Sequence, residues 1–209
     1  MRAGAPPGPD DQLVVQVSRW DRLKDMAGVM RGFADHVDDP GTHLALVGPD
    51  VSGVTDDPEG PEVLAECIAL WRDLPHAARN RIQLVCLPMD DAEENAAIVN
   101  AIQRHAAVVV QKSLAEGFGL TVAEAMWKAR PVVGSRVGGI ADQIRDPQTG
   151  VLLDDPADEA ALGAALRDLL ATPEKARAMG RAGRQRAIDH FLGSRHLLQY
   201  VDVFADLLA

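Results

Sequence analysis

Two glutamates flank a glycine-rich turn in the segment SLAEGFGLTVAEA, residues 113–125. Glu116 and Glu124 lie eight positions apart, and Gly117 and Gly119 stand between them. Glycine lets the backbone approach a ligand closely, and the free N–H groups at a helix start attract anions. With a helix beginning near Leu120, this turn predicts an anion site with a carboxylate on each side.

A carboxylate accepts hydrogen bonds from sugar hydroxyl groups. Glu124 lies about one turn inside the expected helix and suits the two hydroxyls of a ribose, whereas Glu116 suits those of a second sugar. The alternative is a tight loop whose glutamates only stabilise the helix start. The turn is not the dinucleotide-binding glycine fingerprint, because Val122 stands where that fingerprint has its third glycine.

A second candidate site is the segment VSRWDRLKD, residues 17–25. Arg19 offers a planar fork of donors and Lys24 a compact charge, so together they suit a diphosphate. The alternative is ordinary surface charge, paired with Asp21 and Asp25. Trp20 lies beside Arg19 and is either a packing residue or a platform for stacking.

Hydrophobic patterning predicts the elements that must position these residues. Short apolar runs predict strands at residues 13–17, 43–48, 82–87, 106–110, 131–134 and 151–153. Apolar residues at helical spacing predict helices at residues 26–37, 62–74, 92–104, 122–128, 160–170, 173–187 and 197–208, with a polar loop at residues 49–61.

Continuous apolar strands are typical of a parallel sheet whose two faces are both covered. The predicted fold class is therefore α/β, a Rossmann-like parallel sheet with helices on both faces, followed by C-terminal helices. Ligands of such sheets bind outside the carboxyl ends of the strands. The loops after each strand, which include both candidate segments, are where a site is expected.

Composition excludes some functions. The 209 residues suit one domain, and the net charge of -10 argues against binding to nucleic acid or to anionic membranes. Cys67 and Cys86 lie in apolar contexts and are expected to be buried free thiols in a reducing compartment. The six histidines lack metal-ligand spacing, so no metal site is expected.

Residues 1–12 lack the apolar centre of a signal peptide and predict a flexible lead-in. No apolar stretch is long enough to cross a bilayer, and a cytoplasmic protein is expected. Residues 13–209 then form a single domain, in which residues 173–209 are a helical tail.

The combined pattern resembles the second domain of family 4 GT-B glycosyltransferases, from about residue 14 to about residue 191. Its parts are Arg, four residues, then Lys after the first strand, and later Glu, seven residues, then Glu. Five further segments resemble the trehalose glycosyltransferring synthases: DDPEG (56–60), VNAIQR (99–104), VQKS (110–113), EAMWK (124–128) and VGGI (137–140).

The resemblance implies roles for individual residues. Arg19 and Lys24 hold the diphosphate of a nucleotide-sugar donor, Glu124 binds its ribose and Glu116 contacts the transferred glucose. The backbone of Gly117, Phe118, Gly119 and Leu120 lines the sugar and phosphate, and the loop that begins at Leu87 borders the base. Arg19, Lys24 and Glu116 are the implied catalytic residues; transfer proceeds with retention, without metal or other cofactor, and no covalent nucleophile is assigned.

The implied activity is glucosyl transfer from UDP- or ADP-glucose, in trehalose synthesis from glucose. The implied partners are the donor, a sugar acceptor and an absent N-terminal acceptor domain, and exposed cleft surface would favour a homodimer. Two alternatives stay open. One is a retaining trehalose phosphorylase, which uses phosphate and no nucleotide, and the other is a non-catalytic nucleotide-binding remnant.

Overall fold

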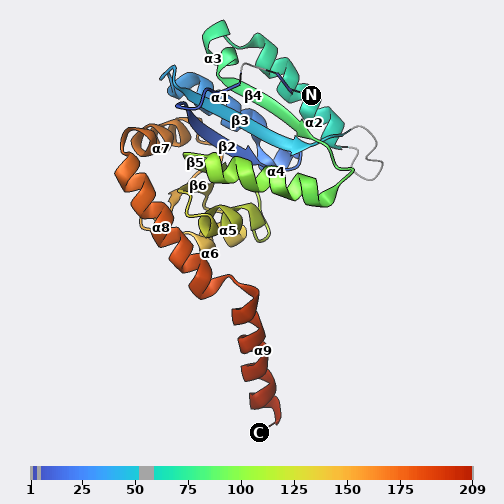
Figure 1. Ribbon diagram of the computed structural model, residues 1–209, viewed down its shortest axis with the longest axis vertical. Helices are drawn as coiled ribbons and strands as arrows, with labels where there is room; N and C mark the ends of the chain where they lie inside the picture. Colours follow the sequence, from blue (N-terminus) through green and yellow to red (C-terminus); the bar gives the residue numbers. More distant parts are fainter. Residues whose placement is uncertain (1, 4–5, 52–58, 209) are drawn as a thin grey trace.

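A computed structural model describes residues 2–3, 6–51 and 59–208, which form one sheet with helices on both faces (Figure 1). The strands are β1 (Arg2–Ala3), β2 (Gln12–Val17), β3 (Thr42–Pro49), β4 (Ile82–Leu87), β5 (Val108–Gln111), β6 (Val132–Ser135) and β7 (Val151–Leu153). Strands β2 to β7 run parallel, and β1 is antiparallel to β4. The predicted α/β fold is confirmed, and every predicted strand is present.

The helices follow the predicted alternation with the strands. They are α1 (Met26–His36), α2 (Glu59–Asp73), α3 (His76–Asn80), α4 (Ala92–His105), α5 (Leu120–Trp127), α6 (Gly138–Gln143), α7 (Glu159–Ala171), α8 (Pro173–His190) and α9 (Gly193–Leu208), with a 3-10 helix, η1 (Arg22–Lys24), before α1. The sequence did not predict α3 and α6, because five or six residues are too few to show helical periodicity. Most of the loop expected at residues 49–61 lies outside the described residues.

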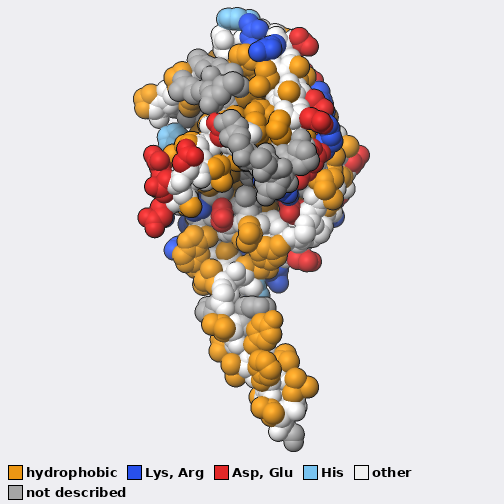
Figure 2. Space-filling model, turned by 90° about the vertical axis from the view of Figure 1, so that its right-hand side faces the viewer, with side chains coloured by type: hydrophobic (Ala, Val, Ile, Leu, Met, Phe, Trp, Pro, Cys, Tyr) orange, Lys and Arg blue, Asp and Glu red, His pale blue; other side chains and the backbone are white. Residues whose placement is uncertain are grey.

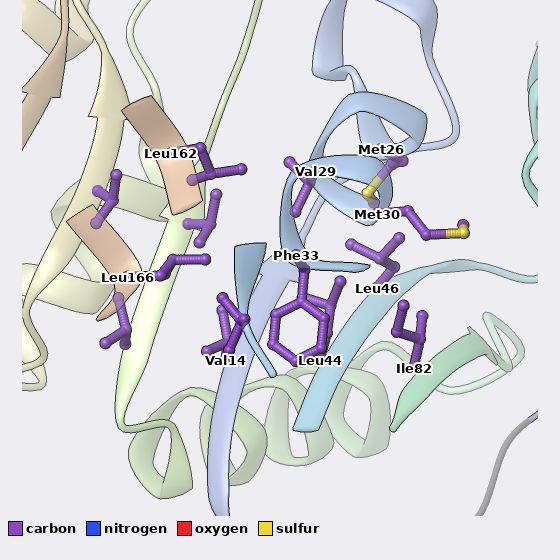
Figure 3. Packing of buried hydrophobic residues seen from close by; sticks show 14 of the residues in the cluster. Val14, Met26, Val29, Met30, Phe33, Leu44, Leu46, Ile82, Leu162 and Leu166 are labelled. Atoms are coloured by element: carbon purple, nitrogen blue, oxygen red, sulfur yellow. The ribbon is translucent and has the colours of Figure 1, made fainter. Parts of the chain in front are cut away.

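The hydrophobic core forms two clusters, one on each face of the sheet, because successive strand residues point to opposite faces. Val14 belongs to the cluster under α1, α2 and α7, whereas its neighbour Val15 belongs to the cluster with α4, α5 and α6. Figure 3 shows the first cluster, in which the fully buried Phe33 of α1 packs with Leu44 of β3 and Leu162 of α7 is also buried.

The order of the strands reverses between β2 and β5. The sheet order is β1-β4-β3-β2-β5-β6-β7, so the chain builds outward from β2 to one side and then returns to build from β5 to the other. Val14 pairs with Val108 and Val15 with Val109. At such a reversal the two following loops diverge and open a crevice at the carboxyl ends of the strands. A ligand site is therefore expected between the loops after β2 and β5.

The start of the chain differs from the prediction of a flexible lead-in over residues 1–12. Arg2 lies opposite Val85 and Ala3 opposite Leu84, so β1 forms an edge of the sheet, and Gln12 already belongs to β2. A strand of two residues is too short to show an alternating pattern in the sequence. Residues 1, 4 and 5 lie outside the described part of the chain.

The helical tail predicted at residues 173–209 has two parts with different packing. Helix α8 packs against α5 and α7 and buries Ala176, Met179 and Ala187. Helix α9 extends away from the body of the molecule and displays a stripe of apolar side chains (Figures 1 and 2). These exposed side chains are Leu197, Leu198, Tyr200, Val201, Val203, Phe204, Leu207 and Leu208. None of the described helices is both long and apolar enough to cross a membrane.

Both cysteines are free thiols, as predicted, but they differ in burial. Cys67 of α2 is fully buried, and loss of hydration raises the pKa of its thiol to about 12. Cys86 of β4 is only partly buried, so the expectation of two buried thiols is correct for Cys67 alone.

Helices α1 and α7 pack so closely that Gly163 has no room for a side chain. A Cβ atom added there would lie 2.2 Å from the Cβ atom of His36. We expect Gly163→Ala to lower the free energy of unfolding by about 1–3 kcal/mol, the usual cost of an overpacked contact. Urea denaturation followed by circular dichroism measures the change.

Gly193→Ala is the control, because Gly193 also belongs to a helix, α9, but has no atom within 4 Å of an added Cβ atom. We expect this variant to unfold at the urea concentration of the native chain or slightly above it. Equal midpoints for the two variants would contradict the close packing of α1 on α7.

Candidate functional site

Two loops meet at the reversal of the sheet: the β2 loop (residues 18–25) and the β5 loop (residues 112–119). The ammonium of Lys24 in the first lies 2.7 Å from Oε2 of Glu116 in the second, although the two residues are 92 positions apart in the chain. Their side chains are only 17% and 12% exposed. The two candidate segments of the sequence therefore form one site.

A first hollow of about 390 Å³ opens beside this ion pair. Its lining includes the ammonium of Lys24, the carboxylate of Glu116 and the first residues of α5. Its lining residues are Val17, Ser18, Arg19, Lys24, Gln111, Glu116, Phe118, Gly119, Leu120 and Thr121. Most of the predicted site residues thus lie around a single concave surface.

The start of α5 has the features of an anion-binding helix terminus. Gly119 is its N-cap residue with φ of 84°, a left-handed conformation that favours glycine. Because glycine has no side chain to cap the helix, the N–H groups of the first turn at Leu120 and Thr121 lack such a partner. They lie at the first hollow, where the positive end of the helix dipole favours a negative ligand.

Helix α6 holds the glycine turn by hydrogen bonds from both of its ends. The N–H of Gly139 donates to the carbonyl of Gly117 at 2.8 Å, and the Gln143 amide donates to the carbonyls of Phe118 and Gly119. A Cβ atom on Gly138 would lie 1.8 Å from the carbonyl oxygen of Glu116. The pair of glycines after Val137 therefore permits the close approach that shapes the turn.

Gln111 is a site residue whose role the sequence analysis missed. Its buried amide accepts from the hydroxyl of Thr121 at 2.7 Å and donates towards those of Ser113 and Ser18 at 3.0 and 3.2 Å. Ser113 in turn donates to Glu116 at 3.3 Å. In the sequence, Gln111 is part of the family resemblance and Ser113 begins the glycine-turn segment, but neither is a candidate site residue. The signal that could have identified them is their capacity for hydrogen bonds directly after a buried strand.

Arg19 lies at the rim of the first hollow with 64% of its side chain exposed, 3.1 Å from the carboxylate of Asp21. The alternative of ordinary surface pairing therefore holds for one contact of Arg19. It does not hold for Lys24, which pairs with Glu116, whereas Asp25 pairs with Lys112. Lys24 is thus directed into the site, and Arg19 stands at its entrance.

A second hollow of about 250 Å³ continues from the first. The two share Val17, Ser18, Arg19 and Thr121, so they form one elongated surface. The remaining walls of the second hollow are mainly apolar: Val47, Gly48, Pro49, Leu87, Met89, Asn95 and Val99. This hollow suits a flat group with apolar faces, next to a charged group in the first.

Two candidate residues, Glu124 and Trp20, line neither of the two hollows. Glu124 is exposed on α5, accepts from the amide of Gln103 at 3.4 Å and lines neither of these two hollows, so its ribose role stays a prediction. Trp20 is fully buried and donates to the carbonyl of Pro49 at 2.9 Å. Because its indole fills the space beside Gly48, Trp20 is a packing residue and no stacking platform.

Metal ligation has no candidate in the described part of the chain. Within those residues, no three or more histidines, cysteines, aspartates and glutamates gather as a group that could hold a metal ion.

Comparison with known proteins gives the site a context. The chain matches the family model described as "Glycosyl transferases group 1" over residues 2–186. It is 42% identical over 197 residues to a protein named trehalose synthase from Rubrobacter xylanophilus, an alignment that covers 94% of this chain and 44% of the relative. A trehalose synthase from Pyrococcus horikoshii is 36% identical over 202 residues, which cover 95% of this chain and 45% of the relative.

Solved structures resemble the chain at the level of the whole fold. A sucrose-phosphate synthase from Thermosynechococcus elongatus matches with a TM-score of 0.76 and 29% identity, over 95% of this chain and 46% of that chain. The chain thus spans a little less than half the length of the curated relatives and of this solved structure.

Proposed function

The chain belongs to the group 1 glycosyltransferases, and we propose that it is the donor-binding half of a retaining enzyme that transfers glucose from UDP-glucose or ADP-glucose. One observation carries this proposal. The contact of Lys24 with Glu116 brings a cation and a carboxylate together in the wall of the first hollow, which also includes the first residues of α5.

The donor fits this surface in three parts. The diphosphate lies against Lys24, Arg19 and the first N–H groups of α5, because each of these favours negative charge. The glucose lies at Glu116, whose carboxylate accepts hydrogen bonds from hydroxyl groups. The base occupies the second hollow, bordered by Leu87 and Met89.

The chemistry follows from the charge that develops during transfer. When the anomeric C–O bond breaks, its electron pair goes to the leaving diphosphate, and the sugar becomes oxocarbenium-like. Lys24, Arg19 and the start of α5 already face that diphosphate and stabilise its added charge without rearranging. Glu116 positions the sugar and is not assigned as a covalent nucleophile. These protein charges take the place of a metal ion, and no cofactor is required.

The acceptor is the finer part of the proposal. The relatives from Rubrobacter xylanophilus and Pyrococcus horikoshii are named trehalose synthase. We therefore propose that the acceptor is glucose and the product trehalose. The acceptor itself binds to a second, N-terminal domain that faces the first hollow.

Two exposed apolar surfaces support the need for a second domain. Leu23, Leu114, Phe118, Leu120 and Met89 are exposed around the site, and α9 presents its apolar stripe beyond the body of the molecule. Large apolar side chains exposed in these numbers are typical of an interface. In a longer protein the acceptor domain covers these surfaces, and this chain alone is expected to show no rapid glucosyl transfer.

The donor site is tested by calorimetric binding of UDP, ADP, GDP and inorganic phosphate to the chain. We expect UDP or ADP to bind, and the Arg19→Ala/Lys24→Ala variant to bind it at least 100-fold more weakly. Each lost hydrogen bond to a charged group costs about 1.5–3 kcal/mol, and about 2.7 kcal/mol corresponds to this factor.

Lys175→Ala/Arg177→Ala is the matched control, because it removes the same two charge types from the exposed surface of α8. Its affinity is expected to stay within about twofold of the native value, since exposed ion pairs contribute little. Binding of phosphate without nucleotide would instead favour the phosphorylase. Absence of binding by every probe would contradict a donor site formed by this half alone.

The apolar stripe of α9 is exposed to water and is expected to drive association between copies of the chain. We expect the isolated chain to self-associate at micromolar concentration, and Val201→Lys/Phe204→Lys to keep it monomeric in analytical ultracentrifugation. Gln199→Lys/Asp206→Asn changes the net charge equally on the polar side of the same helix and should leave the association unchanged. A monomeric native chain would show that this stripe drives no association by itself.

A further inference from the structure

Lys112 is a fully buried cation that the proposed donor chemistry does not use. It directly follows β5, its side chain has 0% exposure, and its ammonium forms an ion pair with Oδ2 of Asp25. Taking a charge out of water is costly, so a buried lysine needs a well-placed partner. Asp25, which is 16% exposed, belongs to the β2 loop, and the pair therefore links the two loops of the site.

Asp25 controls the backbone at the point where Lys24 leaves the loop. It ends η1 and is the N-cap residue of α1, where its side chain accepts from the N–H of Gly28 at 3.0 Å. Its φ of 46° and ψ of 45° lie in the left-handed region, which costs energy for a residue other than glycine. A strong partner is therefore required to keep Asp25, and with it the preceding Lys24, in this conformation.

Further hydrogen bonds hold Leu23 and Lys24, the two residues before Asp25. The buried amide of Gln16 donates to the carbonyl of Lys24 at 2.6 Å and accepts from the N–H of Lys112 at 3.2 Å. The N–H of Leu114 donates to the carbonyl of Leu23 at 2.7 Å. Residues 23 and 25 thus each contact the β5 loop, and residue 24 contacts Gln16, a side chain that the same loop also contacts.

We propose that Lys112 and Asp25 are positioning residues, which hold the β2 loop so that the ammonium of Lys24 already faces the diphosphate site before the donor arrives. The consequence for nucleotide binding rests on the proposed function, whereas the hold on the loop does not. A loop that is ordered in advance costs less to organise on binding, so the affinity for a nucleoside diphosphate is higher. Neither side chain touches the donor; both act through Lys24.

The variants separate this role from general stability. Asp25→Asn keeps an oxygen for the N–H of Gly28 and tolerates the left-handed conformation, and Lys112→Met keeps the length of the buried side chain without its charge. Each single variant leaves one unpaired polar group and should lower the urea midpoint. Asp25→Asn/Lys112→Met removes both charges, so we expect it to recover most of that loss.

Amide hydrogen exchange measures the loop without any ligand. In the double variant we expect exchange at residues 23–25 and at Gly28 to become at least tenfold faster, with strand β3 unchanged. Arg31→Met/Glu159→Gln is the matched control. It removes an ion pair between α1 and α7, in which a guanidinium nitrogen of Arg31 lies 2.7 Å from a carboxylate oxygen of Glu159. Its exchange at residues 23–25 should stay native.

Binding of UDP, measured by calorimetry, tests the consequence. We expect the dissociation constant of the double variant to rise at least tenfold, while the control variant keeps the native value. Native exchange at residues 23–25 in the double variant, or in Asp25→Asn should the double variant fail to fold, would overturn the proposal. So would native affinity for UDP in a double variant whose loop exchanges faster.

These readouts also distinguish the positioning role from the donor function. If the native chain binds no nucleotide but the double variant exchanges faster at residues 23–25, the proposed function fails and the hold of Lys112 on the loop stands. If the native chain binds UDP and the double variant matches it in both readouts, the donor site stands and the positioning role fails.

Discussion

The parallel pairing of β2 with β5 is the constraint on which the site depends. The chain first builds β2, β3 and β4 in one direction and then returns with β5 to the free edge of β2. Only this return places the β2 loop, with Lys24, against the β5 loop, with Glu116. The two apolar clusters on the faces of the sheet stabilise the pairing. Buried polar residues, Gln16 and Gln111, lie towards the carboxyl ends of β2 and β5.

The charges after β2 and β5 are arranged in local ion pairs that the net charge of the chain does not predict. The chain carries a net charge of -10, yet two lysines lie in the loops of the site. Lys24 and Lys112 are far apart in the sequence, and each forms an ion pair with one carboxylate from the other loop. The pair of Lys112 is buried and supports the backbone. The pair of Lys24 lines the first hollow, where we propose that the donor diphosphate binds.

The molecule has a closed α/β core, but part of its surface is apolar and exposed. Its core is closed on both faces of the sheet, and α8 returns to pack on α5 and α7. The apolar rim of the site and the stripe of α9 remain exposed, and the curated relatives are about twice as long as this chain. This contrast is consistent with our proposal that a second domain packs against this one.

The sequence by itself determined the α/β class of the fold and most of the candidate site residues. Six short apolar runs with intervening helical spacing are local patterns, and so is the glycine turn around Gly117 and Gly119; all were predicted because hydrophobic period and turn chemistry depend on neighbouring residues alone. The shorter elements β1, α3 and α6 escaped prediction because two to six residues carry too little pattern.

Only the tertiary structure decided that β5 lies beside β2, that Lys24 meets Glu116 across 92 positions, and that Asp25 pairs with Lys112. It also decided that Trp20 is buried and that Glu124 stays exposed. Strand order and side-chain burial arise from contacts between distant segments, which no local pattern of residues encodes.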